Sequence, residues 1–199
     1  MHHTADYFDA KFATDDDPWR FRSRWYEARK RAMLLACLTR PRYACAFEPG
    51  CANGELSAAL AERCDRLIVS EGSERAVALA RQRTAELRQV EVRKAWVPDE
   101  WPAERFDLIV VSELGYFLSG EALAAFITKA RASLLEGGSV LACHWRHGSD
   151  DCEFDGDEVH RRLEASLAMP RLCHVFEDDF RIDLWCDDPR SVAQLEGLA

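Results

Sequence analysis

The sequence contains no long hydrophobic run, and no apolar stretch approaches the roughly 20 residues that a membrane-spanning helix needs. The segment 1–6 is polar, so it does not resemble the apolar core of a secretory signal peptide. We therefore expect a cytoplasmic protein without a membrane partner. Its 199 residues, 48% hydrophobic and 31% charged, are enough for one folded domain with a buried core.

Positive charge is the minority: 26 Lys and Arg face 35 Asp and Glu, which gives a net charge of −9. A negatively charged protein repels phosphate backbones, so we expect no nucleic-acid partner. The same charge would suit a cationic ligand, although it also simply keeps a protein soluble. The composition therefore favours a small-molecule partner.

Closely paired cysteines are absent, because none of the eight cysteines belongs to a C-x-x-C pair. Cysteines scattered through apolar stretches are typical of reduced, buried thiols in a cytosolic protein. A zinc site could be drawn from Cys143, His147, Cys152 and His160, but their spacing matches no known zinc module. We expect no bound metal.

After Pro41, short apolar runs alternate with longer amphipathic runs, which is typical of β-α-β units around a parallel sheet. The last two apolar runs are joined by a short acidic turn and read as an antiparallel hairpin. We expect strands at 43–48, 66–71, 90–94, 106–112, 139–145, 172–177 and 180–186, and helices at 54–64, 73–87, 120–135 and 157–167. Gly137-Gly138 would close the third of these helices. Ligands of such sheets bind at the carboxyl ends of the strands.

The first 40 residues read as a helical cap on the core. Asp17-Pro18 is a helix start signal, with a capping carboxylate followed by proline, and Pro41 ends the helix. We expect a single domain over 1–199, with the cap at 1–40 and the α/β core at 41–199. The cap is either a lid over a ligand or a helix that only covers the sheet. The expected lid and substrate residues are Trp19, Arg22, Trp25, Tyr26 and, from the core, Trp145.

The dinucleotide fingerprint G-x-G-x-x-G is also missing. In its place Glu48-Pro-Gly-Cys-Ala-Asn-Gly54 leaves a strand and enters a helix with glycines four apart. The fingerprint's middle glycine serves a pyrophosphate, so this loop favours a ligand without one. Gly50 allows close approach of the backbone to the ligand, and Gly54 allows the helix to pack tightly. Glu48 can meet a cationic amine through a water or a backbone group. The alternative is an ordinary turn between strand and helix.

A second acidic residue, Glu71, ends the next strand, about 20 residues past the glycine loop. A carboxylate at that place can accept two hydroxyl hydrogen bonds from a ribose. The alternative is a solvated charge at a strand end.

These residues resemble class I methyltransferases that use S-adenosylmethionine (SAM): an E-x-G-x-x-x-G loop, then an acid ending the second strand. The segments 17–22, 25–27, 106–110, 112–118 and 144–146 are similar to the nodulation protein S-like branch, named for an enzyme that N-methylates a de-acetylated chitooligosaccharide. The resemblance extends from Tyr7 to Trp185.

The resemblance implies a Rossmann-like α/β fold: a mostly parallel seven-stranded sheet with an antiparallel C-terminal hairpin and an N-terminal helical lid. It also implies SAM as cofactor and S-adenosylhomocysteine as product. The residues expected to bind the cofactor are Glu48, Gly50, Cys51, Ala52, Asn53, Gly54, Glu71, Gly72, Trp96, Val97 and Glu113.

One position departs from the superfamily pattern. An acidic residue often follows the third strand and binds the adenine amino group, but here Trp96 stands near that position. Trp96 can stack on adenine while a backbone carbonyl or Asp99 takes the amino group. The alternatives are weaker adenine binding, or a Trp96 that belongs only to the core.

Methyl transfer is an in-line displacement at a sulfonium, and an amine acceptor must first lose its proton. We expect the catalytic residues His144, Glu113 and Tyr116 at the ends of strands four and five. His144 would take the proton, unless it is a structural histidine. Glu113 would hold a cationic acceptor, unless it belongs only to the cofactor loop. Tyr116 and Trp145 would line the methyl channel, where aromatic faces favour cations.

The expected reaction is therefore methylation of a small-molecule acceptor, in first place an amine such as an amino sugar. An O-methyltransferase and a SAM-binding regulatory protein without turnover remain alternatives. The loop spacing disfavours a nicotinamide dehydrogenase. The absence of an N-P-P-Y-type motif after strand four argues against methylation of DNA bases. We expect a monomer or a homodimer.

Overall fold

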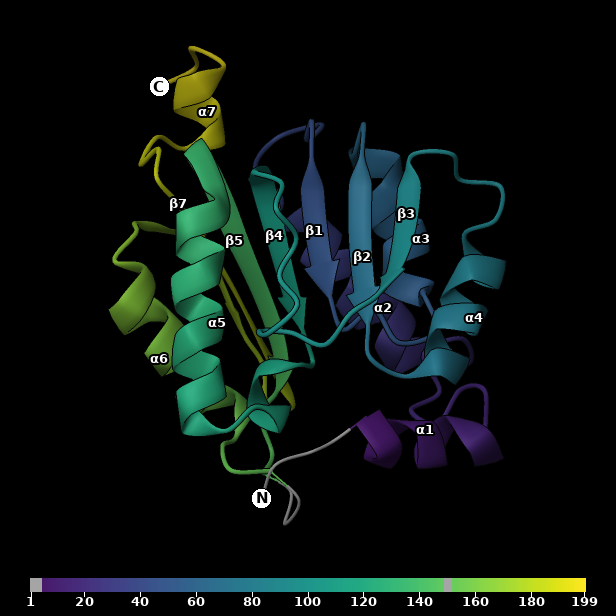
Figure 1. The fold of residues 1–199 in the computed structure, drawn as a ribbon. Helices are drawn as coiled ribbons and strands as arrows, with labels where there is room; N and C mark the ends of the chain where they lie inside the picture. Colours follow the sequence, from purple (N-terminus) through teal and green to yellow (C-terminus); the bar gives the residue numbers. More distant parts are fainter. Residues whose placement is uncertain (1–4, 149–151) are drawn as a thin grey trace.

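A seven-stranded sheet with the order β3-β2-β1-β4-β5-β7-β6 forms the centre of the molecule in the computed structural model, which describes residues 5–148 and 152–199 (Figure 1). The strands are β1 (Ala46–Pro49), β2 (Leu67–Glu71), β3 (Val90–Lys94), β4 (Phe106–Ser112), β5 (Leu134–Trp145), β6 (Arg171–Phe176) and β7 (Phe180–Cys186). The first five strands are parallel, whereas β7 runs antiparallel to β5 and β6. The expected Rossmann-like methyltransferase sheet with its antiparallel hairpin is confirmed.

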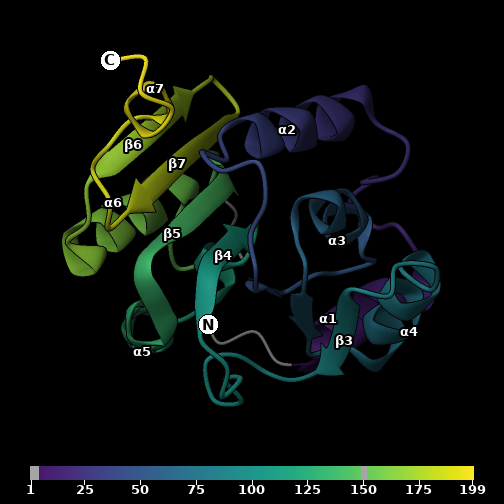
Figure 2. The same ribbon diagram turned by 90° about the horizontal axis from the view of Figure 1, so that it is seen from above.

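Helices cover both faces of the sheet, as Figure 2 shows with α2 and α3 on one side and α5 on the other. The helices are α1 (Ala5–Thr14), α2 (Trp25–Ala36), α3 (Glu55–Leu60), α4 (Glu74–Arg83), α5 (Gly120–Ser133), α6 (Gly156–Leu167) and α7 (Val192–Leu195), with short 3₁₀ turns η1 (Ala61–Arg63) and η2 (Gly115–Phe117). Within the described ranges, none of these helices has the length and apolar character needed to cross a membrane.

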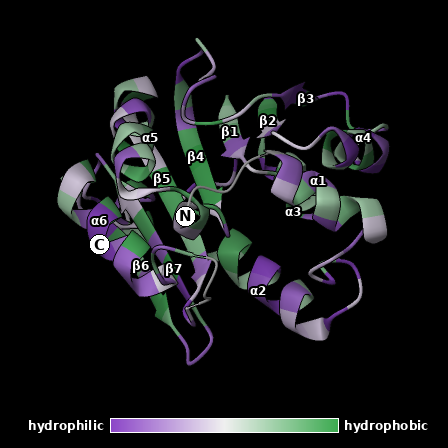
Figure 3. Ribbon diagram, turned by 60° about the horizontal axis from the view of Figure 1, so that its bottom comes forward, coloured by the Kyte–Doolittle hydropathy of each residue, from purple (hydrophilic) through white to green (hydrophobic). Residues whose placement is uncertain are grey.

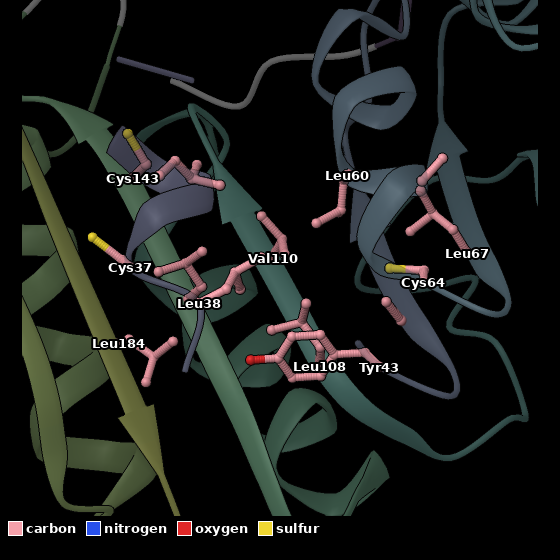
Figure 4. Close-up of a cluster of buried hydrophobic side chains, with 14 of the residues drawn as sticks. Cys37, Leu38, Tyr43, Leu60, Cys64, Leu67, Leu108, Val110, Cys143 and Leu184 are labelled. Atoms are coloured by element: carbon pink, nitrogen blue, oxygen red, sulfur yellow. The ribbon is translucent and has the colours of Figure 1, made fainter. Parts of the chain in front are cut away.

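Strand β4 shows why the central strands are apolar on both sides. Leu108 and Val110 pack into the core cluster under α2 and α3, whereas Ile109 and Val111 pack into the cluster under α5 and α6. Successive side chains of a strand point to opposite faces, so a strand between two helical layers must be apolar throughout. Figure 3 shows β4 and β5 mostly in hydrophobic colours, and Figure 4 shows Leu108 beside the Tyr43 ring in the cluster that also holds Val110 and Leu60.

The N-terminal segment differs from the expected single helix. Helix α1 ends at Thr14, and α2 begins only at Trp25. The carboxylate of Asp17 accepts hydrogen bonds from the backbone N–H groups of Phe21 (2.8 Å) and Arg22 (3.1 Å), which closes a loop instead of capping a helix. A backbone that turns back on the Asp17 carboxylate in this way cannot also continue as a helix, so the predicted helix start at Asp17-Pro18 is wrong.

The predicted role of Gly137-Gly138 is also wrong. Helix α5 ends at Ser133, and the chain becomes extended at Leu134, which pairs with Phe106 of β4. The two glycines therefore lie within β5, close to a register shift in its pairing with β4. Tertiary pairing of the strand ends the helix before the glycines are reached.

Candidate active site

A cavity of about 660 Å³ opens at the carboxyl ends of the parallel strands, between the sheet and the N-terminal segment. It brings together most of the residues that the sequence singled out. Ten of the predicted cofactor residues line it: Glu48, Gly50, Cys51, Ala52, Asn53, Glu71, Gly72, Trp96, Val97 and Glu113. Trp19, Tyr26, Tyr116 and Trp145 line it as well.

The carboxylate of Glu71 is held in place by three backbone N–H groups. Oε1 accepts hydrogen bonds from Gly72 (2.8 Å) and Ser73 (3.0 Å), and Oε2 accepts one from Ala52 (2.9 Å). A carboxylate offers about four lone-pair sites, so it can still accept a hydrogen bond from a ligand in the cavity. Burial raises the pKa of Glu71, although the three N–H bonds oppose that rise. This geometry suits a ligand hydroxyl.

Glu48 lies at the end of β1 and is 2% exposed. Within the described chain its Oε2 has no hydrogen-bond partner, and burial raises its pKa to about 8. A buried polar atom without a partner costs about 1–3 kcal/mol. A cationic group of a ligand placed beside Glu48 would supply that partner and favour the ionised carboxylate.

Two glycines of the site are fixed by close neighbours. At Gly54, φ is +81°, and a Cβ would lie 3.0 Å from the Cα of Ala80, so this loop packs tightly on α4. Gly54 does not line the cavity, and its role is to seat the loop. At Gly72 a Cβ would lie 2.1 Å from Cε3 of Trp96, so the indole ring lies directly against the backbone next to Glu71. The Trp96 ring therefore packs against Gly72 and also lines the cavity.

Glu113 is the centre of a buried polar cluster on the opposite side of the cavity. Its Oε1 lies 2.5 Å from Nζ of Lys30, and its Oε2 accepts hydrogen bonds from the Tyr116 hydroxyl (2.5 Å) and the Trp145 backbone N–H (2.9 Å). Lys30 Nζ also lies 3.2 Å from Oε1 of Glu27. Burial opposes the charge of Lys30, but Glu113 and Glu27 hold its pKa above the usual range.

Sequence reasoning missed Lys30 and the importance of Glu27. Both line the cavity and both are buried, at 6% and 9% exposure. A signal was present, since two opposite charges spaced i, i+3 lie beside the apolar residues Met33 and Leu34 of α2. Their main partner, Glu113, is 83 residues away, so no local pattern could identify it.

The structure places His144 outside the cavity lining, in the core behind it. Its Nε2 accepts a hydrogen bond from the Gly115 N–H (3.1 Å), and its Nδ1 lies 3.0 Å from Nε2 of His160. Both ring nitrogens are occupied, and burial holds the pKa of His144 well below its usual range. His144 therefore cannot take a proton from an acceptor in the cavity, and its prediction as the base is wrong.

Two of the expected lid residues also lie away from the cavity. Trp25 is 77% exposed, because it occupies the first position of α2 on the outer side. Arg22 pairs with Glu55 at 3.1 Å on the surface and does not line the cavity. The structure does not place these two side chains at the cavity, so their contact with a substrate stays a prediction, whereas Tyr26 packs edge-to-face on Trp145 in the cavity wall.

The sequence profile of the family described as nodulation protein S (NodS) matches residues 4–143, more than half of the chain. The chain belongs to the nodulation protein S family. Nodulation protein S of Sinorhizobium fredii is 36% identical over 104 residues, which are 52% of this chain and 48% of the relative. That of Rhizobium tropici is 36% identical over 104 residues, 44% of its length. The chain thus spans about half the length of the curated family members it matches.

Two crystal structures have the same fold as this chain. A protein of Pseudomonas syringae described as a methyltransferase is 50% identical, with 82% of this chain and 99% of that chain covered, and a TM-score of 0.74. The N-methyltransferase NodS of Bradyrhizobium japonicum WM9, in complex with S-adenosyl-L-homocysteine, is 24% identical, with 94% and 98% covered, and a TM-score of 0.78. The second likeness shows the fold alone.

Proposed function

We propose that this chain is a SAM-dependent methyltransferase that transfers a methyl group to a small-molecule acceptor, and that the acceptor is an amine. The observation that carries the proposal is the arrangement of Glu48 and Glu71, two buried carboxylates at the ends of neighbouring parallel strands that face one cavity. The Bradyrhizobium relative, which holds S-adenosyl-L-homocysteine, and the methyltransferase of Pseudomonas syringae support it.

The residues in the cavity fit SAM. The fixed carboxylate of Glu71 would accept hydrogen bonds from the ribose hydroxyls, and the indole of Trp96 would lie beside the adenine. Glu48, whose Oε2 lacks a partner within the described chain, would face the ammonium of the methionine part. When bound, SAM supplies an electrophilic methyl group on a sulfonium. These roles are part of the proposal, as are those of Gly50, Asn53 and the other lining residues.

The wall opposite Glu71 favours an amine as acceptor. Glu27 and Glu113 both bind the ammonium of Lys30, and Arg31, which also lines the cavity, is a further cation near Glu27. The rings of Tyr26 and Trp145 line the same part of the cavity, and aromatic faces attract cations. The two carboxylates of this wall would favour an acceptor that enters as an ammonium. Glu113 is already held by Lys30, Tyr116 and the Trp145 backbone N–H, so we assign it a positioning role.

His147 replaces His144 as the imidazole that faces the cavity. Its Nε2 lies 3.0 Å from Oδ1 of Asp179, and both side chains are about half exposed at the cavity lining. A carboxylate that orients an imidazole in this way is a common arrangement for proton transfer. We assign His147 to the removal of the acceptor's proton toward solvent.

The rest of the proposal concerns the whole molecule. One continuous sheet with a core on each face supports a single domain over 1–199, with residues 1–40 as the cap and 41–199 as the core. A cytoplasmic location, a monomeric or homodimeric state and the lack of a nucleic-acid partner stay predictions from the sequence.

The test begins with calorimetric titration of SAM, S-adenosylhomocysteine and NAD into the purified chain, followed by amine acceptors with detection of S-adenosylhomocysteine. We expect micromolar binding of the first two, no binding of NAD, and turnover with an amine. Turnover only with the matching alcohols would show an O-methyltransferase. Binding without turnover on any acceptor would support a regulatory SAM-binding protein, and absence of SAM binding would overturn the proposal.

A further inference from the structure

A chain of three fully buried polar side chains runs behind the cavity, from β7 through α6 to β5. Nδ1 of His160 lies 2.6 Å from Oδ2 of Asp183, and Nε2 of His160 lies 3.0 Å from Nδ1 of His144. Nε2 of His144 accepts the hydrogen bond of the Gly115 N–H at 3.1 Å. All three side chains have no exposed surface. Because His144 does not act as the base, the proposed methyl transfer gives these three side chains no role.

The hydrogen bond from the Gly115 N–H to His144 fixes the donor and acceptor of each other hydrogen bond in this row of side chains. A backbone N–H can only donate, so Nε2 of His144 must be unprotonated. The proton of the neutral His144 ring is then on Nδ1 and is donated to Nε2 of His160. That leaves the proton of His160 on Nδ1, where it is donated to Asp183. Both imidazoles are therefore neutral Nδ1–H tautomers.

Asp183 is held ionised at the other end of the chain. Besides His160 it meets Arg181 (2.5 Å), His174 (2.7 Å) and Arg171 (3.3 Å) from the two hairpin strands. Burial alone would raise the pKa of Asp183, but the bonds from His160 and Arg181 hold it below its usual range. An ionised Asp183 can only accept, which agrees with the direction of the chain.

The chain ends on the turn that carries the acceptor side of the cavity. Gly115 begins η2, and its neighbours Tyr116 and Phe117 line the cavity. A Cβ at position 115 would lie 2.4 Å from Cγ1 of Val159, so the turn is seated directly on α6. The Tyr116 ring packs edge-on against His144, with centroids 5.5 Å apart, and its hydroxyl binds Glu113.

We propose that Asp183, His160 and His144 form a positioning relay that fixes the turn Gly115–Phe117, and through it Tyr116 and Glu113, on the acceptor side of the cavity. The effect on catalysis rests on the proposed function, whereas the hydrogen-bond direction does not. The relay holds only while both imidazoles are neutral, because an added proton places two N–H groups face to face.

Burial, more than any neighbouring charge, favours the neutral form of both imidazoles in the relay. His144 faces His160 from α6, Lys30 from α2 and the Tyr116 ring from η2. Burial, His160 and Lys30 together hold the pKa of His144 well below its usual range. Burial also lowers the pKa of His160, against the pull of Asp183, while Arg181 of β7 lowers it further and Asp157 of α6 raises it. We expect the relay to break only in acid.

The first test is ¹⁵N NMR of the imidazole rings in the unmodified protein at pH 7. We expect protonated Nδ1 and unprotonated Nε2 for both His144 and His160. A protonated Nε2 on His144, or a charged ring on either residue, would overturn the inference. This measurement needs no methyl transfer, so it separates failure of the relay from failure of the proposed function.

The second test compares His160→Gln with His174→Gln, which removes a partly exposed ligand of the same Asp183 but leaves the relay intact. We expect His160→Gln to shift the Gly115 amide resonance and to lower kcat about tenfold, since small displacements in an active site cost up to about a hundredfold. SAM affinity should stay within about twofold of the unmodified protein in both variants, which also reports that they fold. An unchanged Gly115 resonance and kcat in His160→Gln, or equal losses in His174→Gln, would contradict the relay.

Discussion

The backbone N–H of Ala52 donates a hydrogen bond of 2.9 Å to the carboxylate of Glu71, which joins the glycine loop after β1 to the end of β2. The bond fixes the loop and the carboxylate relative to each other before any ligand arrives. Preorganisation of this kind lowers the cost of ordering a binding site. It also explains why a carboxylate is needed at position 71 even apart from contact with a ligand.

Gly54→Ala should lower the free energy of unfolding by about 1–3 kcal/mol, because it combines a positive φ with a contact of 3.0 Å to the backbone of Ala80. Gly197→Ala is the matched control, since φ there is +73° but nothing lies within 4 Å of the added Cβ. Urea unfolding of both variants separates backbone strain from the clash. Equal losses in the two variants would show that packing of the loop on α4 contributes nothing.

Lys30→Met should destabilise the protein by about 3 kcal/mol or more, because it leaves Glu27 and Glu113 buried without their shared cation. Adding Glu27→Gln to Lys30→Met should restore part of that loss, since one uncompensated charge is removed. Urea unfolding of the single and double variants measures the coupling. A double variant no more stable than Lys30→Met would argue against a shared charge cluster.

Glu48 should make the stability of the ligand-free protein depend on pH. Its pKa is about 8 in the folded chain and about 4.3 when unfolded. The folded state therefore binds one more proton between these values, and the contribution of Glu48 to stability falls as pH rises through this window. Glu48→Gln should gain stability relative to the unmodified protein from pH 5 to pH 9. A stability difference that does not change with pH would show that Glu48 is already ionised at pH 5.

His147→Gln should lower kcat for an amine acceptor while leaving SAM affinity unchanged, because His147 lies at the solvent side of the cavity and not among the cofactor residues. A smaller effect is expected for Asp179→Asn, which disturbs only the orientation of the ring. The pH profile of kcat measured for both variants is the readout. An unchanged profile in His147→Gln would leave proton removal to solvent alone.

The sheet and the cofactor half of the cavity could be predicted from the sequence for a physical reason. Apolar runs buried on both faces leave a clear pattern, and the glycine loop with Glu48 and Glu71 lies at strand ends whose relative position the topology fixes. The structure of the N-terminal segment could not be predicted in the same way. There, the Asp17 side chain binds the local backbone and Asn53 of the loop, so a helix signal becomes a loop.

The prediction of His144 as a cavity residue shows most clearly what the sequence could not reveal. Cys143 faces the cavity, whereas His144 faces α6, because successive residues of β5 point to opposite sides of the sheet. A shift of one residue in the expected register therefore moves a side chain from the site into the core. The cluster around Lys30 could not be predicted because its partner Glu113, the residue after β4, lies 83 residues away in the sequence.

Calorimetric titration of SAM into the unmodified chain, Glu71→Ala and Glu71→Gln tests the central claim most directly. Glu74→Ala serves as the control, because Glu74 lies on the exposed surface at the start of α4. We expect micromolar binding that both Glu71 variants weaken by about tenfold or more, as loss of a charged hydrogen-bond acceptor does, and that Glu74→Ala leaves unchanged. Absence of SAM binding, or binding that is indifferent to Glu71, would contradict the assignment of this cavity as a SAM site.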